Sequence, residues 1–128
     1  MSSFPQDLRY TPDHEWLRSA GTAWRVGITQ FAVDQLGDIT IVELPKPGDS
    51  VTKGEPFGTV ESVKSVSELY APVSGKVTAV NAELNHSPEF INDEPYGTGW
   101  MIEIEPSSKA ELDDLLSPDA YAQHIAAQ

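Results

Sequence analysis

Lys64 is the residue of this 128-residue sequence whose setting most favours chemistry. It stands in the run Glu61-Ser62-Val63-Lys64-Ser65, between two segments with strand character. A long side chain at a hairpin tip can enter another protein's active site while its own scaffold stays outside. On spacing alone, however, the favoured interpretation is an ordinary solvated turn lysine. A Schiff-base lysine would need a lowered pKa, whereas Glu61 and Glu68 favour the charged ammonium.

The composition excludes several classes of partner and cofactor. A formal net charge of -12 and a pI of about 4.4 disfavour nucleic acid and an anionic membrane surface. The chain contains no cysteine, so redox sulfur would have to arrive on a cofactor. The N-terminus lacks the basic start and apolar stretch of a signal peptide, and no apolar run is long enough to span a bilayer. We expect a protein of a reducing compartment, with a cytoplasmic location.

The elements that must position Lys64 are mostly short strands. Alternating or β-branched patterns separated by Gly and Pro turns predict a mainly β fold. Between the first two strands, Thr29 can cap a short helix that ends at Gly37. The segment 81–99 shows turn signals only. The predicted strands are 24–28, 39–44, 57–63, 66–71, 76–80 and 100–105.

The C-terminal part changes to a helical period. Ser108-Lys109-Ala110-Glu111 has the form of a capping box, followed by Leu112, Leu115 and Leu116 on one predicted helical face. Pro118 is suited to the first position of a second helix. We therefore expect one domain over residues 1–128, with 107–128 as a helical cap.

The run Asp13-His14-Glu15-Trp16 is a candidate metal motif, but it lacks the second histidine that a zincin motif requires. His86 and His124 stand alone in the sequence. We therefore expect no metal site. Trp16, Trp24 and Trp100 are expected in or near the core.

The motifs around Lys64 occur in the order typical of one family. They include Val42-Glu43-Leu44-Pro45, Val51-Thr52-Lys53-Gly54 and Val60-Glu61-Ser62-Val63-Lys64-Ser65, and they extend to Tyr10–Trp16 and Gly99-Trp100-Met101. From about Tyr10 to Leu116 the sequence resembles the glycine cleavage system H proteins. Val63 and Ser65 beside the lysine differ from the Ala-Met-Lys-Met of biotin carriers. They also differ from the lipoyl domains of 2-oxoacid dehydrogenases, which more often have Asp before the lysine.

The resemblance implies a barrel-sandwich hybrid (lipoyl/biotinyl hammerhead) fold and a monomeric carrier that catalyses no step itself. It implies lipoic acid in amide linkage to Lys64, with Glu61, Ser62, Val63 and Ser65 as the attachment motif. The lipoyl group would then carry an aminomethyl group from glycine decarboxylase (P protein) to aminomethyltransferase (T protein). It would pass electrons to dihydrolipoamide dehydrogenase (L protein). Lipoate-attaching enzymes would be further partners.

The resemblance also implies a cleft that shelters the loaded arm. Glu15 matches the family's cleft glutamate, although an ordinary strand-face carboxylate is an equal interpretation without the resemblance. Asp13 stands where serine is frequent, and Glu68 stands where aspartate is common, so the cleft's details differ from the family pattern. Carboxylates can pair with an aminomethyl cation, more strongly when partly buried.

Two alternatives to glycine cleavage stay open. The first is an H-like lipoyl protein that acts in lipoate relay or in sulfur oxidation. The second is an interaction module in which Lys64 remains unmodified. Because H proteins occur in bacteria and in mitochondria, a mitochondrial location is the alternative to the bacterial cytoplasm.

Overall fold

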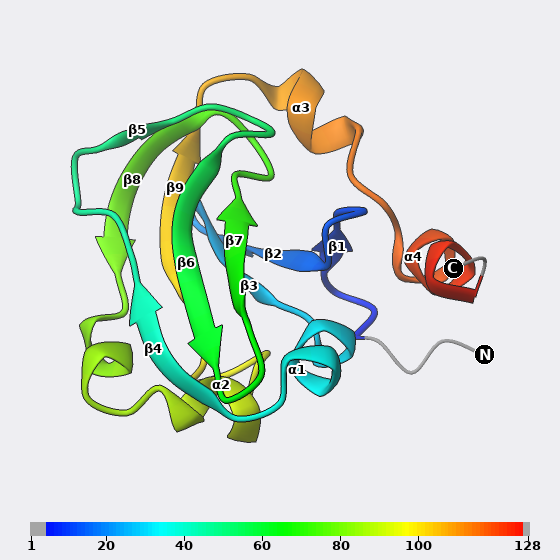
Figure 1. Cartoon of the computed structure of the whole chain (residues 1–128). Coiled ribbons are helices and arrows are strands. Elements are labelled where there is room, and N and C mark those ends of the chain that lie inside the picture. Colours follow the sequence, from blue (N-terminus) through cyan, green and yellow to red (C-terminus); the bar gives the residue numbers. More distant parts are fainter. Residues whose placement is uncertain (1–4, 127–128) are drawn as a thin grey trace.

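The computed structural model describes residues 5–126, and it contains two antiparallel β-sheets around a common core (Figure 1). This confirms the mainly β prediction. The six-stranded sheet has the order β1-β2-β3-β9-β8-β5. Its strands are β1 (Arg9–Tyr10), β2 (Glu15–Ala20), β3 (Ala23–Ile28), β9 (Ile102–Pro106), β8 (Gly75–Val80) and β5 (Ser50–Val51). The three-stranded sheet β4-β6-β7 consists of β4 (Ile39–Glu43), β6 (Pro56–Ser62) and β7 (Val66–Tyr70).

Short helices lie around the two sheets. The helices are α1 (Gln30–Leu36), the 3-10 helix η1 (Ala82–Asn85), α2 (Glu89–Asp93), α3 (Lys109–Asp113) and α4 (Pro118–Ala126). In the part of the chain that the structure describes, no helix has the length and apolar character needed to cross a membrane. Residues 1–4 of the expected domain and 127–128 of the expected cap lie outside the described residues.

The main core lies between the two sheets, because each sheet turns one apolar face inward. In the large sheet, Leu17 pairs with Val26, and Val26 pairs with Ile102, so all three side chains lie on one face. All three have no exposed surface. In the small sheet, Val42 pairs with Val60 and contributes to the same cluster.

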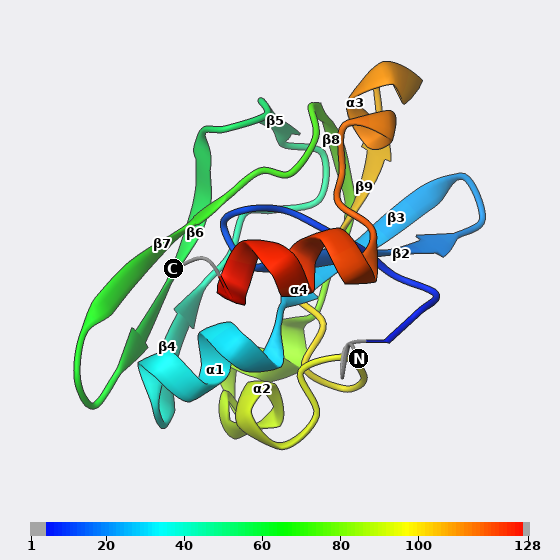
Figure 2. The same ribbon diagram turned by 90° about the vertical axis from the view of Figure 1, so that its right-hand side faces the viewer.

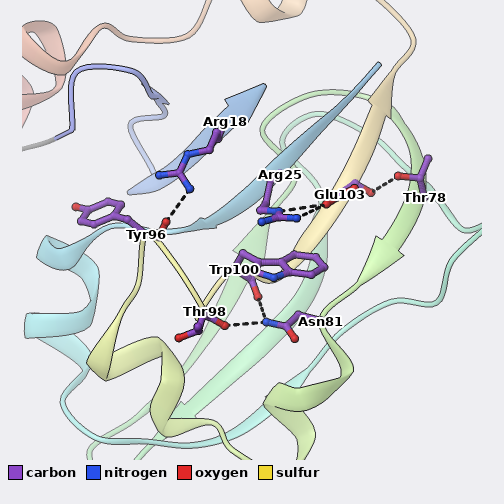
Figure 3. A network of polar contacts seen from close by, with 8 residues as sticks. All are labelled: Arg18, Arg25, Thr78, Asn81, Tyr96, Thr98, Trp100 and Glu103. Atoms are coloured by element: carbon purple, nitrogen blue, oxygen red, sulfur yellow. Dashed lines mark hydrogen bonds and ion pairs between the residues drawn. The ribbon is translucent and has the colours of Figure 1, made fainter. Parts of the chain in front are cut away.

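The opposite face of the large sheet carries two arginines with polar partners (Figure 3). Arg18 and Arg25 lie directly opposite each other on β2 and β3, where like charges repel. Glu103 on β9 neutralises Arg25, with Nη2 and Oε2 2.9 Å apart. Arg18 instead donates to the Tyr96 carbonyl at 2.9 Å. The Arg18 contact fastens the loop before β9 to the sheet.

Helix α1 forms as its terminal residues predict. The Thr29 side chain accepts a hydrogen bond from the Ala32 N–H, and the Gly37 N–H donates to the Val33 carbonyl. Gly37 has a φ of 80°, a conformation that glycine adopts without a steric penalty. The helix that precedes β4 is therefore delimited on both sides by local chemistry.

A second cluster of buried side chains joins α4 to the N-terminal strands. It consists of Leu8, Tyr10, Trp16 and Tyr121. Figure 2 shows α4 in front of the sheets and close to α1. Of the three tryptophans, Trp16 is fully buried, and Trp24 and Trp100 are partly buried. The expectation that they lie in or near the core is confirmed.

The predicted C-terminal capping box is wrong, although the helix does begin after Ser108. The Ser108 side chain makes no capping hydrogen bond. Glu111 accepts instead from the N–H and the hydroxyl of Ser74, at 2.7 and 3.2 Å. The single leucine face is also wrong, because α3 ends at Asp113. Leu116, beyond that end, exchanges two backbone hydrogen bonds with Tyr10.

Other assignments in the C-terminal half also differ from the sequence prediction. The last strand begins at Ile102 rather than Trp100. Met101 is fully buried, and its N–H donates to the Val26 carbonyl at 2.8 Å. The segment 81–99, for which the sequence shows only turn signals, contains η1 and α2.

Candidate functional site

Lys64 lies in the turn of the β6–β7 hairpin, as predicted. The Ser62 N–H donates to the Ser65 carbonyl at 2.8 Å and closes the turn. The Ser62 hydroxyl oxygen accepts from the N–H groups of Lys64 and Ser65, both at 3.2 Å. Such a serine turn fixes the backbone on which the exposed Lys64 side chain stands.

The Lys64 side chain lies against the end of α1. A β-carbon built on Gly37 would lie 3.2 Å from Lys64 Cε and 3.7 Å from Nζ. The hairpin is fastened to the same region, because the Val63 N–H donates to the Asp38 carbonyl at 3.2 Å. The absence of a side chain at Gly37 therefore leaves room for the lysine beside α1.

Exposed apolar side chains surround this turn. Among the described residues, the exposed large hydrophobic side chains are Ile41, Val63 and Val66, with 50%, 70% and 63% of their surface exposed. Ile41 and Val66 each pair with Glu61 across the small sheet. The side chains of Ile41, Glu61 and Val66 therefore share one face of that sheet. The hairpin tip thus presents apolar and acidic groups together.

A cavity of about 400 Å³ opens beside the turn. It lies along β7, which is an edge strand of the small sheet. Its described lining includes three carboxylates, and it contains no lysine or arginine. The lining residues are Pro12, Asp13, His14, Glu15, Ile28, Ala32, Gln35, Leu36, Val60, Ser65, Ser67, Glu68, Leu69 and Tyr70.

Glu15 is the buried carboxylate of this cavity, with only 2% of its surface exposed. Oε1 accepts from the Thr11 hydroxyl at 3.1 Å, and Oε2 accepts from the Tyr70 N–H at 2.9 Å. Both donors are neutral. Burial raises the pKa of Glu15 from 4.5 to about 8, although the two hydrogen bonds oppose this shift. Asp13 contributes further by like-charge repulsion.

A tight turn from Thr11 to Glu15 presents the carboxylates. The Thr11 N–H donates to the Glu15 carbonyl at 3.0 Å. The Thr11 hydroxyl oxygen accepts from the N–H groups of Asp13 and Glu15, both at 3.2 Å. Thr11 is itself 5% exposed, so one threonine side chain organises both the turn and the Glu15 carboxylate.

The structure brings together part of the residue set predicted from the sequence. Asp13, Glu15, Glu68 and Ser65 all line the one cavity. Lys64 lies beside this cavity without lining it. Glu61, Ser62 and Val63 belong to the hairpin and likewise lie outside the described lining.

Sequence reasoning did not identify three groups at this site. Thr11 could have been suspected, because a threonine before Pro-Asp is a turn signal. Gly37 was recognised only as the end of a helix. The Tyr70 N–H is a backbone group at a sheet edge, so no side-chain pattern in the sequence reports it.

Neither the histidines nor the acidic residues form a metal centre within residues 5–126. No group of three His, Cys, Asp or Glu side chains there is arranged to hold an ion. The His14 ring instead lies 2.8 Å (Nδ1) from the Tyr121 hydroxyl. The cavity can accept a small cation, because its lining combines carboxylates with apolar side chains.

Comparison with known proteins gives a consistent match along the chain. A family model described as glycine cleavage H-protein matches residues 8–128. The glycine cleavage system H protein of Anoxybacillus flavithermus is 58% identical over 123 residues, covering 96% of this chain and 97% of that protein. The probable glycine cleavage system H protein of Haloarcula marismortui is 58% identical over 121 residues, covering 94% and 95%.

A solved structure shows the same architecture. The crystal structure of a glycine cleavage system H protein from Mycobacterium marinum superimposes with a TM-score of 0.88. It is 41% identical, and the match covers 96% of this chain and 99% of that chain.

The raised pKa of Glu15 predicts how stability depends on pH. Between pH 4.5 and about 8 the folded chain holds a proton on Glu15 that the unfolded chain has lost. The free energy of unfolding should therefore fall as pH rises through this range. Glu15→Gln should lack this component in urea titrations at several pH values.

The comparison with Glu15→Gln removes the effect of His14, whose pKa is lowered by burial and by His124. His14 is present in both proteins and acts in the opposite direction, because its lowered pKa makes stability fall as pH drops. Parallel stability curves for the wild type and the variant would show that Glu15 ionises normally.

Proposed function

Because this chain belongs to the glycine cleavage H-protein family, the lipoyl carriers of the glycine cleavage system, we propose that Lys64 carries lipoate in amide linkage. The chain is a carrier subunit of that system and not itself a catalyst. The observation that supports the proposal most is the exposed Lys64 on a fixed hairpin turn beside a cavity lined by carboxylates.

The residues present fit such a group. An amide at Nζ removes the lysine charge, and Lys64 takes part in none of the ion pairs among the described residues. Gly37 leaves space beside the side chain, and the neighbouring Leu36 and Ala32 offer apolar surface in the cavity. When bound, the lipoyl dithiolane would supply the redox-active sulfur that this cysteine-free chain lacks.

The cavity is proposed to hold the aminomethyl-bearing end of the arm. Glu15 provides a buried carboxylate, and Asp13 and Glu68 provide exposed ones at the same cavity. A cationic amine would favour the ionised form of Glu15 and lower its pKa. Burial strengthens that pairing, and the cavity walls would limit the access of water to the adduct.

Partnership with the other components of the glycine cleavage system follows from the family. We propose that a lipoate-attaching enzyme first modifies Lys64. Glycine decarboxylase would then load the aminomethyl group, aminomethyltransferase would receive it, and dihydrolipoamide dehydrogenase would accept the electrons. Ile41, Val63 and Val66 offer apolar contacts to an enzyme that must reach Nζ. The net charge of -12 favours basic surfaces on these partners. Bacterial relatives support a cytoplasmic location, and we propose a monomer.

Attachment to Lys64 is testable by intact mass. Protein incubated with lipoate, ATP and a lipoate–protein ligase should gain the mass of one lipoyl group. Lys64→Arg should gain none, because guanidinium does not form this amide. Lys76→Arg is the matched control, since Lys76 is an exposed lysine of β8, and it should be modified like the wild type. Modification of Lys64→Arg, or a wild type that is never modified, would contradict the proposal.

The role of Glu15 is testable on the loaded carrier. Glu15→Gln keeps the size of the side chain and an acceptor for the Tyr70 N–H, but it removes the charge. The aminomethyl-loaded form should decay about tenfold faster, the change expected when a charge-assisted hydrogen bond is lost. Lipoylation should be unaffected. Glu83→Gln, an exposed glutamate of η1, serves as control. Equal lifetimes for both variants would remove Glu15 from this role.

A further inference from the structure

The C-terminal helix α4 contributes a buried hydroxyl group that contacts His14, a residue lining the cavity. Tyr121 has no exposed surface. Its Oη lies 2.8 Å from His14 Nδ1 and 2.7 Å from Thr29 Oγ1. His14 belongs to the turn that carries the carboxylates, and Thr29 precedes α1. One side chain from the end of the chain thus joins two segments that flank the cavity.

The two residues described here as contacting the Tyr121 hydroxyl, His14 and Thr29, occupy positions whose conformation depends on surrounding contacts. His14 has a φ of 70°. Among the non-glycine residues that the structure describes, it is the one with a positive φ. This conformation is unfavourable for residues with a β-carbon and persists where surrounding contacts maintain it. Thr29 donates its N–H to the His14 carbonyl at 3.0 Å and caps α1 through its hydroxyl. The two positions are therefore coupled directly as well as through Tyr121.

The position of His14 determines where the neighbouring carboxylates lie. Asp13 and Glu15 flank it in the sequence, and all three line the cavity. The polar side chains that are buried in the described part are Thr11, Glu15, Thr29 and Asn81. Three of these four belong to the turn or to its contact with α1. Such a concentration of buried polar groups requires well-defined hydrogen bonds.

We propose that Tyr121 is a positioning residue of the cavity, whose hydroxyl holds His14 and Thr29 so that the Thr11–Glu15 turn presents Asp13 and Glu15 to a cationic amine. The helix α4 is accordingly part of the functional unit. The identity of the cation rests on the proposed function. The positioning itself is a property of the unmodified chain, so it can be tested without lipoate.

Tyr10 provides a matched control within the same structure. Its ring stacks on Tyr121, with centroids 4.8 Å apart and an interplanar angle of 7°. Its hydroxyl donates to the Pro5 carbonyl at 2.8 Å, and Tyr10 is also fully buried. Tyr10→Phe and Tyr121→Phe therefore each remove one hydrogen-bonded hydroxyl from the same stacked pair, and among the described contacts it is the Tyr121 hydroxyl that reaches the turn, through His14.

The first readout is amide hydrogen exchange by NMR in the unlipoylated protein. The Asp13 and Glu15 N–H groups both donate to Thr11 Oγ1, so their exchange reports opening of the turn. In Tyr121→Phe their exchange should accelerate about tenfold, and in Tyr10→Phe by no more than about twofold. Equal acceleration in both variants would mean a general loss of stability and would overturn the proposal.

Thr29 provides an independent variant should Tyr121→Phe fail to fold. Thr29→Val removes the hydroxyl and should accelerate exchange of the same two amides. Thr29→Ser retains the hydroxyl and should restore slow exchange. Fast exchange in Thr29→Ser as well, or slow exchange in Thr29→Val, would contradict a role for this hydroxyl contact.

The second readout is the lifetime of the aminomethyl-loaded carrier. Tyr121→Phe should shorten it, while Tyr10→Phe should not, and both should be lipoylated at the wild-type rate. Altered exchange with an unchanged lifetime would overturn the link between the turn and the cation. If the wild type gained no lipoyl group, the proposed function would fail while the exchange experiment still decided the positioning role.

Discussion

The arrangement of the site depends on one buried carboxylate that is held by neutral donors. Taking the Glu15 carboxylate out of water is unfavourable, and no cationic side chain of residues 5–126 offsets that cost. Its two oxygens join the turn before β2 to the edge strand β7, and thereby connect the two sheets at the cavity. A group so held is poised to change its ionisation when a cation arrives.

The same interaction explains why the cavity lies where it does. An edge strand leaves part of its backbone without a neighbouring strand, and proteins commonly cover such an edge. Here the Glu15 carboxylate accepts a hydrogen bond from the Tyr70 N–H of β7. Helix α1 lies across the cavity from that strand. The hairpin that begins β7 also carries Lys64, so an arm attached there starts at the mouth of the cavity. In the proposed carrier, scaffold and arm have separate tasks: the sheets fix the geometry, and the attached group would supply the chemistry.

Local chemistry decided most of the fold, and those parts were predictable. Thr29 and Gly37 delimit α1 as their types imply, and the strands on either side of Lys64 follow from β-branched residues between turns. The parts that could not be predicted depend on distant partners. Glu111 binds Ser74 rather than its own helix end, and Met101 is buried by pairing with β3. At the site, Lys64 and Glu15 were singled out through a resemblance to a family, whereas Tyr121 contacts the site through tertiary hydrogen bonds that no sequence pattern encodes.

The most direct test of this account is the titration of the Glu15 carboxyl group by ¹³C NMR, before and after loading of the arm with the aminomethyl group. The account predicts a pKa near the value of about 8 in the unloaded protein, and a marked decrease once the cationic amine occupies the cavity. An unloaded pKa near 4.5 would contradict the buried, cation-free environment. A raised pKa that loading leaves unchanged would show that the amine does not pair with Glu15.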